Sequence, residues 1–416
     1  MTTDYSAHVA LDWGDKTHAF ALQPAQGTSE SGTIEANPEA LHGWLEQLHA
    51  RTGGGLVALA LESGKNGLLH ALLGYPWLHL YPVHPAASAR FRTAFVPSGA
   101  KDDVPDAQIL LTLLLRHRDQ LRRLEPEDPA TRRLAALVEA RRHLVDQRTR
   151  FAQELTSALK LYFPQALELM GDDHTAALAL DFLARWPDLA SAQAARPATL
   201  RGFYFSHNVR RPDPIEARLE CLRKARPLTT DPVVIETSAQ LVQALIAVLR
   251  PLNTHIAEFN AKIQEAFAAH PDASLFRNLP GAGPAFAPRL LVAFGANRSR
   301  YPEASNMQKL AGIAPVREKS GRQLWVHWRW NAPKFLRQTF VEWAGSTVVH
   351  SAWARAYYQQ QRRAGKRRQA ALRALAFKWI RIVWRCWQTR TPYDEARYID
   401  ALSRRQSPLA IELAQT

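Results

Sequence analysis

The chain has 416 residues, 46% hydrophobic and 22% charged, which is long enough for two or three domains with sizeable cores. Its net charge of +15 favours an anionic partner, either nucleic acid or an acidic lipid surface. Two cysteines without paired spacing, Cys221 and Cys386, exclude a disulfide framework and a cysteine-ligated zinc. We expect no signal peptide and no membrane-spanning segment, and therefore a cytoplasmic protein.

The first 120 residues alternate between patterns typical of strands and of helices. In chain order we predict strands over 8–14, 17–23 and 31–36, a helix over 38–51, a strand over 56–63, a helix over 67–73 and a strand over 77–83. Three strands, a helix, a strand, a helix and a strand follow the order of an RNase-H-like fold. The fold class is therefore α/β at the N-terminus.

From Asp106 to about Phe163 the pattern becomes helical, with apolar residues three and four apart over 132–163. A second long helix is predicted from about Pro232 to Phe267, with a kink at Pro251. We expect the two long helices to pair antiparallel as a coiled-coil insertion, followed by a small, mostly helical C-terminal domain.

Charge is concentrated in the last third of the chain. Residues 280–416 hold 24 basic and 7 acidic side chains, and eight of the twelve tryptophans lie between Trp325 and Trp387. Basic and aromatic side chains together are typical of nucleic-acid surfaces. The alternative is a solvated basic helix face over a core that contains the tryptophans.

Two acids end predicted strands that are neighbours in the expected sheet. Asp12 precedes Gly14, and Glu62 precedes Ser63 and Gly64. Strand-end acids often cap turns, but two of them at neighbouring strand ends can share a divalent cation, because Mg²⁺ prefers hard oxygen ligands.

More carboxylates lie where a helix is expected to begin. Asp103 and Asp106 are three residues apart, with Pro105 suited to a first helical turn. Acids there either complement the helix dipole or bind the same metal as Asp12 and Glu62. Four carboxylates from three segments favour two-metal phosphoryl transfer, without distinguishing hydrolysis from strand transfer.

Two glycine-containing segments downstream are candidate nucleic-acid contacts. The turn with Gly281 and Gly283 is either a generic turn or the hairpin of a helix-hairpin-helix that holds a DNA phosphate. Further on, Ser320 lies in a glycine-bounded loop among basic side chains. Such a serine is either a turn residue or a nucleophile whose phosphate is held by the cations.

The motifs at 11–14, 59–63, 100–107, 278–283 and 311–321 resemble, in order and spacing, the DEDD transposases of the insertion-sequence-110 family. That resemblance implies a RuvC-like catalytic domain over 1–125, a helical coiled-coil region over 126–272, a transposase domain over 273–360 and a basic accessory tail over 361–416. It also implies a transposase or site-specific recombinase that acts on DNA and is guided by a structured RNA. The protein would be bacterial and nucleoid-associated, and it would form a homo-dimer or tetramer.

Carried over residue by residue, the resemblance makes four acids ligands of Mg²⁺ or Mn²⁺ and Ser320 the nucleophile that forms a phosphoserine link to DNA. The acids are Asp12, Glu62, Asp103 and Asp106, with Asp102 as a substitute for Asp103. Predicted nucleic-acid contacts are Lys101, Gly281, Gly283, Arg317, Lys319, Arg322 and Arg337. Alternative functions are a metal-dependent nuclease that uses water, and a nucleic-acid-binding protein without catalysis.

Overall fold

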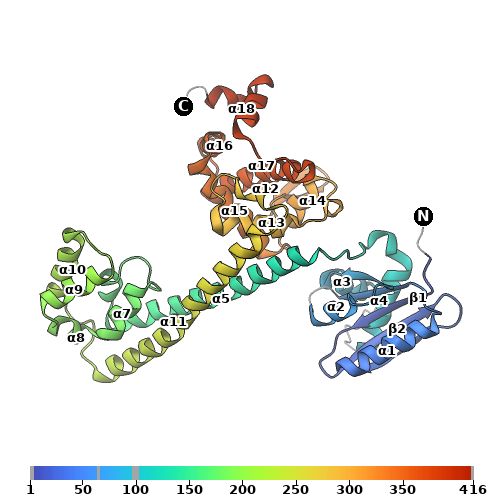
Figure 1. Ribbon diagram of the computed structural model, residues 1–416, viewed down its shortest axis with the longest axis horizontal. Coiled ribbons are helices and arrows are strands. Elements are labelled where there is room, and N and C mark those ends of the chain that lie inside the picture. The colour runs from blue at the N-terminus through green and yellow to red at the C-terminus, as the bar shows by residue number, and fades with distance from the viewer. Residues whose placement is uncertain (1–3, 63–65, 96–102, 414–416) are drawn as a thin grey trace. The chain divides into compact units, whose positions relative to one another are not determined.

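The computed structural model describes residues 4–62, 66–95 and 103–413, and of residues 66, 94–95, 103–105 and 412 it describes the backbone alone. The chain divides into two compact units, Met1–Pro126 and Glu127–Thr416 (Figure 1). Each unit has its own buried core, so each is described by itself.

The first unit is built on a five-stranded mixed sheet in the order β3-β2-β1-β4-β5. Strand β1 pairs antiparallel with β2 and parallel with β4. The strands are β1 (Ala7–Asp12), β2 (Thr17–Pro24), β3 (Glu30–Glu35), β4 (Val57–Glu62) and β5 (Leu78–Val83). The predicted succession of strands and helices over the first 83 residues is confirmed.

Helices cover both faces of this sheet. They are α1 (Pro38–Arg51), α2 (Asn66–Leu72), α3 (Pro85–Phe95) and α4 (Asp103–His117), followed by a short 3-10 turn, η1 (Arg118–Gln120). Alternate residues of β1 and β4 point to opposite faces: Leu11 and Leu61 pack with α1 and α2, whereas Ala10 and Ala60 pack with α4. The alanines allow α4 to lie close to the sheet.

Two long helices form the spine of the second unit, α5 (Pro129–Tyr162) and α11 (Pro232–Ala268). Leu134 packs near Phe267 in one core, and Leu159 packs with Val242 in another, so the helices run antiparallel, as predicted (Figure 1). Pro251 lies inside α11. By length and composition α11 is apolar enough to cross a membrane, but here it packs along α5.

The chain between α5 and α11 forms short helices. These helices build a separate hydrophobic core with the C-terminal end of α5 and the N-terminal half of α11. They are α6 (Ala166–Leu169), α7 (Ala177–Arg185), α8 (Leu189–Ala194), α9 (Pro197–Ser206) and α10 (Pro212–Lys224). Phe163, Phe182 and Tyr204 are fully buried there.

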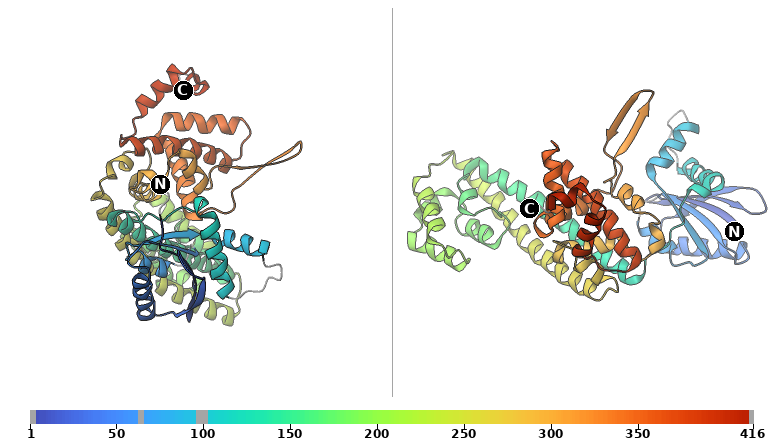
Figure 2. Two further views of the ribbon diagram at one scale, coloured as in Figure 1. Left: turned by 90° about the vertical axis from the view of Figure 1, so that its right-hand side faces the viewer. Right: turned by 90° about the horizontal axis from the view of Figure 1, so that it is seen from above.

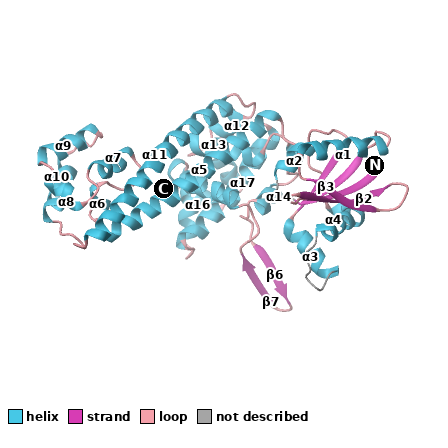
Figure 3. Ribbon diagram, turned by 90° about the horizontal axis from the view of Figure 1, so that it is seen from below, coloured by secondary structure: helices cyan, strands magenta, loops and turns pink. Residues whose placement is uncertain are grey.

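The remainder of the second unit is a helical core from which one β-hairpin projects (Figures 2 and 3). Its elements are α12 (Ala273–Arg277), α13 (Gly283–Phe294), η2 (Arg298–Arg300), α14 (Ala304–Leu310), β6 (Val316–Ser320), β7 (Gln323–His327), α15 (Lys334–His350), α16 (Ala352–Arg363), α17 (Arg368–Thr389), α18 (Glu395–Arg404) and α19 (Pro408–Leu413).

The segment 361–416 was expected to be an accessory arm, and that expectation is wrong for most of it. Helix α17 lies at the centre of the core, where Leu375, Trp379, Val383 and Trp387 are buried against α13 and α15. These residues recur every four positions, so they form one apolar stripe along α17. The tryptophans of α15, α16 and α17 are therefore mostly core residues.

Candidate active site

The register of the sheet brings two of the predicted acids together. Strands β1 and β4 pair in parallel with Leu11 opposite Leu61, so Asp12 and Glu62 are the next residues on adjacent strands. Neighbouring strands lie about 4.8 Å apart. Since the side chains alternate, both carboxylates lie on the face that α4 covers.

A third acid reaches this face from the first turn of α4. Asp106 is only 7% exposed and forms an ion pair with Arg92 of α3, at 2.6 Å between nitrogen and oxygen. Helix α4 packs across β1 and β4. The structure therefore places Asp12, Glu62 and Asp106 at one edge and on one face of the sheet, and we call this set the carboxylate edge.

The remaining predicted acids, Asp102 and Asp103, have no described side chains. Asp103 is the first residue of α4, but its side chain is not described, and Lys101 and Asp102 lie outside the described residues. Within the part of the chain that is described, no group of three acidic, histidine or cysteine side chains is close enough to hold a metal ion.

Two residues that the sequence did not single out hold these acids. The buried Ser88 hydroxyl donates to the Glu62 carboxylate, and Arg92, one helical turn further along α3, pairs with Asp106. Their i, i+4 spacing places them on one side of α3, which is the only sequence signal that points to them. Arg92 compensates the buried charge of Asp106 in this structure.

Ser320 lies in the second unit, at the end of a strand rather than in the loop that we expected. It is the last residue of β6 and pairs with Gln323 across a turn formed by Gly321 and Arg322. Gly321 has a φ of +58°, the left-handed conformation that a two-residue hairpin turn requires. Ser320 is exposed.

Strand alternation separates Ser320 from two of its basic neighbours. Arg317 and Lys319 occupy odd positions of β6 and share a face with Leu324 and Val326 of β7, whereas Ser320 lies on the other face, with Trp325. Only Arg322, in the turn, is free of this alternation. The cations adjacent to Ser320 in the sequence therefore do not surround it in space.

The base of the hairpin is braced against the helical core. The Arg373 guanidinium lies over the Trp328 ring, 3.2 Å from its centroid, and Arg337 donates to the Arg329 carbonyl at 2.7 Å. Arg337, predicted to contact nucleic acid, is thus engaged within the chain. Near the base, His327 contacts Glu318 at 2.9 Å, and this hydrogen bond raises the pKa of His327.

Large apolar side chains in the hairpin and just after it are exposed to solvent. Trp330 is 76% exposed and Trp325 51% exposed, and Leu324 and Val326 are exposed as well. The core tryptophans of the same unit are fully buried by comparison. An apolar surface with arginine and lysine beside it suits a partner that offers both stacking surfaces and negative charge.

The glycine turn joins α12 to α13 and packs on α15. The carbonyls of Pro280 and Gly281 accept hydrogen bonds from Trp343 and Ser346, at 3.0 and 2.9 Å. A Cβ on Gly281 would lie 2.5 Å from the Ser346 hydroxyl, which accounts for glycine there. Gly283, by contrast, is exposed at the N-terminus of α13, so it remains a predicted phosphate contact.

Comparison with known proteins identifies the family. A family model described as "Transposase", of the DEDD insertion-sequence-110 type, matches residues 9–164, and one described as "Transposase IS116/IS110/IS902 family" matches residues 273–359. The chain belongs to the insertion-sequence-110 family of transposases. The two matches contain the carboxylate edge and Ser320, respectively.

Two individual relatives match over most of their length. The chain is 27% identical over 394 residues to the "Mini-circle putative transposase for IS117" of Streptomyces coelicolor, covering 93% of this chain and 95% of the relative. It is 26% identical over 358 residues to the "Insertion element IS900 uncharacterized 42 kDa protein" of Mycobacterium paratuberculosis, covering 85% and 84%. Membership of a transposase family implies DNA recombination activity and DNA as a partner.

Proposed function

We propose that this transposase cuts and rejoins DNA through a covalent intermediate, with the carboxylate edge binding Mg²⁺ or Mn²⁺ and Ser320 acting as the nucleophile. The observation that carries the proposal is the in-register position of Asp12 and Glu62 at the carboxyl ends of adjacent parallel strands, on the face where Asp106 begins α4. This arrangement in a sheet ordered 3-2-1-4-5 supports an RNase-H-like, RuvC-like assignment.

The carboxylate edge offers the ligand type that a hard divalent cation prefers, although its three described side chains are not close enough together to hold an ion in this arrangement. Carboxylate oxygens from Asp12 and Glu62 would be ligands, and Asp106 would join them by exchanging its ion pair with Arg92. An ion held there would polarise the scissile phosphate and stabilise the leaving oxygen. Ser88 meanwhile orients Glu62 by its hydrogen bond.

Ser320 supplies the covalent step. Its Oγ forms a bond to the phosphorus of the target phosphodiester while the bond from phosphorus to the leaving deoxyribose oxygen breaks. The hydroxyl proton passes to water, and the leaving oxygen takes a proton from water, so the phosphodiester count is unchanged. Religation is the reverse reaction with a different deoxyribose hydroxyl. Arg322, two residues after Ser320, lies in the turn that follows β6 and is exposed.

The decisive experiment asks for the covalent adduct. Purified protein is incubated with labelled DNA that carries an element end and Mg²⁺, then denatured and separated by gel electrophoresis. We expect a protein-linked band that is lost in Ser320→Ala, while Ser157→Ala, an exposed serine of α5, retains it. An adduct that persists in Ser320→Ala would show that another residue is the nucleophile.

Asp12→Asn tests the carboxylate edge separately. It should abolish cleavage and adduct while DNA affinity is retained, and it should weaken Mn²⁺ binding measured by calorimetry. Cleavage to free ends without any adduct, retained in Ser320→Ala, would favour the water-dependent nuclease. Unchanged behaviour of Asp12→Asn in every assay would favour a binding protein without catalysis.

We further propose that a structured RNA guides the reaction, as the family resemblance implies. The support here is the net charge of +17 carried by residues 280–416, which provides more cationic surface than a short DNA site requires. RNA that copurifies with the expressed protein and comes from the non-coding end of its own element is the expected result. Purification free of RNA, with full recombination activity, would contradict it.

A further inference from the structure

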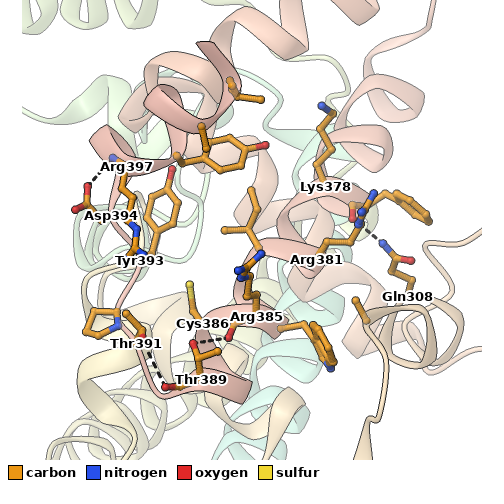
Figure 4. Close-up of a pocket in the computed structure, with 18 of the residues that line it drawn as sticks. Gln308, Lys378, Arg381, Arg385, Cys386, Thr389, Thr391, Tyr393, Asp394 and Arg397 are labelled. Atoms are coloured by element: carbon orange, nitrogen blue, oxygen red, sulfur yellow. Dashed lines mark hydrogen bonds between the residues drawn. The ribbon is translucent and has the colours of Figure 1, made fainter. Parts of the chain in front are cut away.

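A large pocket lies in the second unit, and none of the predicted site residues lines it. Its walls are the N-terminus of α14, the second half of α17, the connection 390–394 and α18, and its volume is about 1070 Å³ (Figure 4). That is at or above the upper end of the range for ligand pockets, about 300–1,000 Å³. We call it the α17–α18 pocket.

Positive charge lines this pocket in two rows. One row stands on α17 at positions 378, 381 and 385, and the other on α18 and its end at positions 397 and 405, so each row follows one helix face. The five side chains are Lys378, Arg381, Arg385, Arg397 and Arg405. Across the described residues, no acidic side chain forms an ion pair with any of them.

The two acids in the lining are already used as helix caps. Asp394 accepts a hydrogen bond from the Arg397 backbone N–H at 3.1 Å, and Glu303 accepts one from the Ser305 hydroxyl at 2.9 Å. Both hold the first turns of α18 and α14, and neither forms an ion pair with a side chain of the rows. The pocket keeps a surplus of three positive charges.

The surplus has an electrostatic cost in the free protein. Burial, and then the neighbouring Arg381, lower the pKa of Lys378. The Lys378 ammonium group makes a cation–π contact with Tyr357, 4.3 Å from the centroid of its ring. Like charges held close together without a counter-charge are stabilised by an anion that binds between them.

Between the rows the lining is aromatic and aliphatic. Trp384 and Tyr398 both line the pocket, and each also contacts a residue outside it. The Trp384 indole N–H donates to the Tyr301 carbonyl at 2.8 Å. The Tyr398 ring packs against the Trp353 ring, with 4.9 Å between their centroids. Rings that are fixed in this way lose little entropy when a planar group stacks on them.

We propose that the α17–α18 pocket binds an unpaired segment of a nucleic-acid strand, with its phosphates on the two cation rows and a base against Trp384 and Tyr398. A polyanion with planar groups satisfies both the spaced cations and the aromatic floor, whereas an acidic peptide satisfies only the cations. A duplex keeps its bases stacked and paired, so it does not supply a base to a pocket. The inference does not depend on Ser320 or on the carboxylate edge.

The test compares oligonucleotides on the full-length protein by fluorescence anisotropy. Labelled 15-nucleotide DNA and RNA single strands and the matching DNA duplex are titrated against wild type and Arg381→Gln/Arg397→Gln, which removes one cation from each row. The control is Arg210→Gln/Arg211→Gln, with the same charge change at exposed positions next to α10. Thermal unfolding confirms that both double variants are folded.

We expect the pocket variant to lose at least about tenfold in affinity for single strands. The slope of log K against log salt concentration should become shallower by about 1.4, because each of two lost phosphate contacts contributes about 0.7. The control should remain within about twofold of wild type. An abasic single strand should bind wild type more weakly than the intact strand, because its bases are missing. Stronger binding of RNA or of DNA in this comparison identifies the natural strand.

Wild-type affinity of the pocket variant for both single strands would overturn the proposal, and so would an equal loss for duplex and single strand. Equal binding of abasic and intact strands by wild type would overturn the placement of a base against Trp384 and Tyr398. These outcomes are independent of the covalent adduct, so they leave the proposed nucleophile untouched.

Discussion

Helix α17 and the β6–β7 hairpin are both rich in tryptophan and arginine, but their surroundings are opposite. In α17, Trp379 and Trp387 are fully buried, whereas Trp325 and Trp330, in and just after the hairpin, are mostly exposed. The helix repeats its apolar residues every three or four positions, and the hairpin has large apolar residues on both of its faces. Composition alone therefore does not separate a core from a binding surface, but periodicity does.

The largest expected difference between the two regions is in stability. Trp379→Ala leaves a cavity in the core and removes the hydrogen bond from its indole to Thr347, so it should destabilise the protein by about 3–5 kcal/mol. Trp330→Ala, at an exposed position, should change the free energy of unfolding by less than about 0.5 kcal/mol. Urea unfolding followed by circular dichroism measures both, and equal effects would contradict the comparison.

DNA affinity should depend more on the exposed Trp330 than on the buried Trp379, the reverse of the order expected for stability. If the hairpin and the residues just after it present stacking surfaces to DNA, Trp330→Ala should weaken binding by about 1–3 kcal/mol, the usual value of one stacked base. Leu161→Ala removes a similarly exposed apolar side chain from α5 and serves as the control. Anisotropy titrations that show no difference between these two variants would remove Trp330 from the DNA interface.

The turn of the hairpin provides a third, smaller test. A β-branched residue at the left-handed position of Gly321 costs about 1–2 kcal/mol, and because the hairpin packs on the core only at its base, the cost should fall on the hairpin alone. We expect Gly321→Val to reduce the yield of the covalent adduct and to leave global unfolding unchanged. Gly321→Asn, which tolerates this conformation, should restore most of the yield.

Acidification should affect the sheet and the hairpin in opposite directions. Burial lowers the pKa of His8, His18 and His79 below the ordinary value of 6.5, so the unfolded chain takes up protons before the folded sheet does. The first unit should therefore lose stability as pH falls below about 6.5. The raised pKa of His327 means that its pairing with Glu318 is complete at low pH and is lost as pH rises through the folded value.

Hydrogen exchange followed by mass spectrometry, at pH values above and below 6.5 and corrected for intrinsic rates, separates these responses. Peptides from β1, β2 and β5 should exchange faster at the lower pH, while peptides from β6 and β7 should not. Protection of the sheet that is independent of pH would show that its histidines do not contribute.

Much of the site was predictable because it depends on local pattern. The alternation that predicts β1 and β4 also places Asp12 and Glu62 at their ends, and the predicted helix start, with Pro105 in the first turn, places Asp106 in that turn. The long helices α5 and α11 are likewise evident from spacings of three and four. Such patterns are local because backbone hydrogen bonds and side-chain alternation repeat over a few residues.

Other features were decided only by tertiary structure, because they depend on residues far apart in the chain. Ser88 and Arg92 come to Glu62 and Asp106 from a helix that the sequence pattern did not reveal. Pairing of β6 with β7 turns Ser320 away from Arg317 and Lys319, although they are adjacent in sequence.

The fate of the basic C-terminal segment shows the same limit. The sequence by itself determined that it is cationic and rich in tryptophan, but the packing of α17 against α13 and α15 decided which tryptophans are buried. The same packing, with α18 opposite α17, decided which arginines face one another across a pocket. The period of α17 predicts which of its faces is apolar, but the elements that cover that face, and the helix that stands across the pocket, depend on residues far apart in the chain.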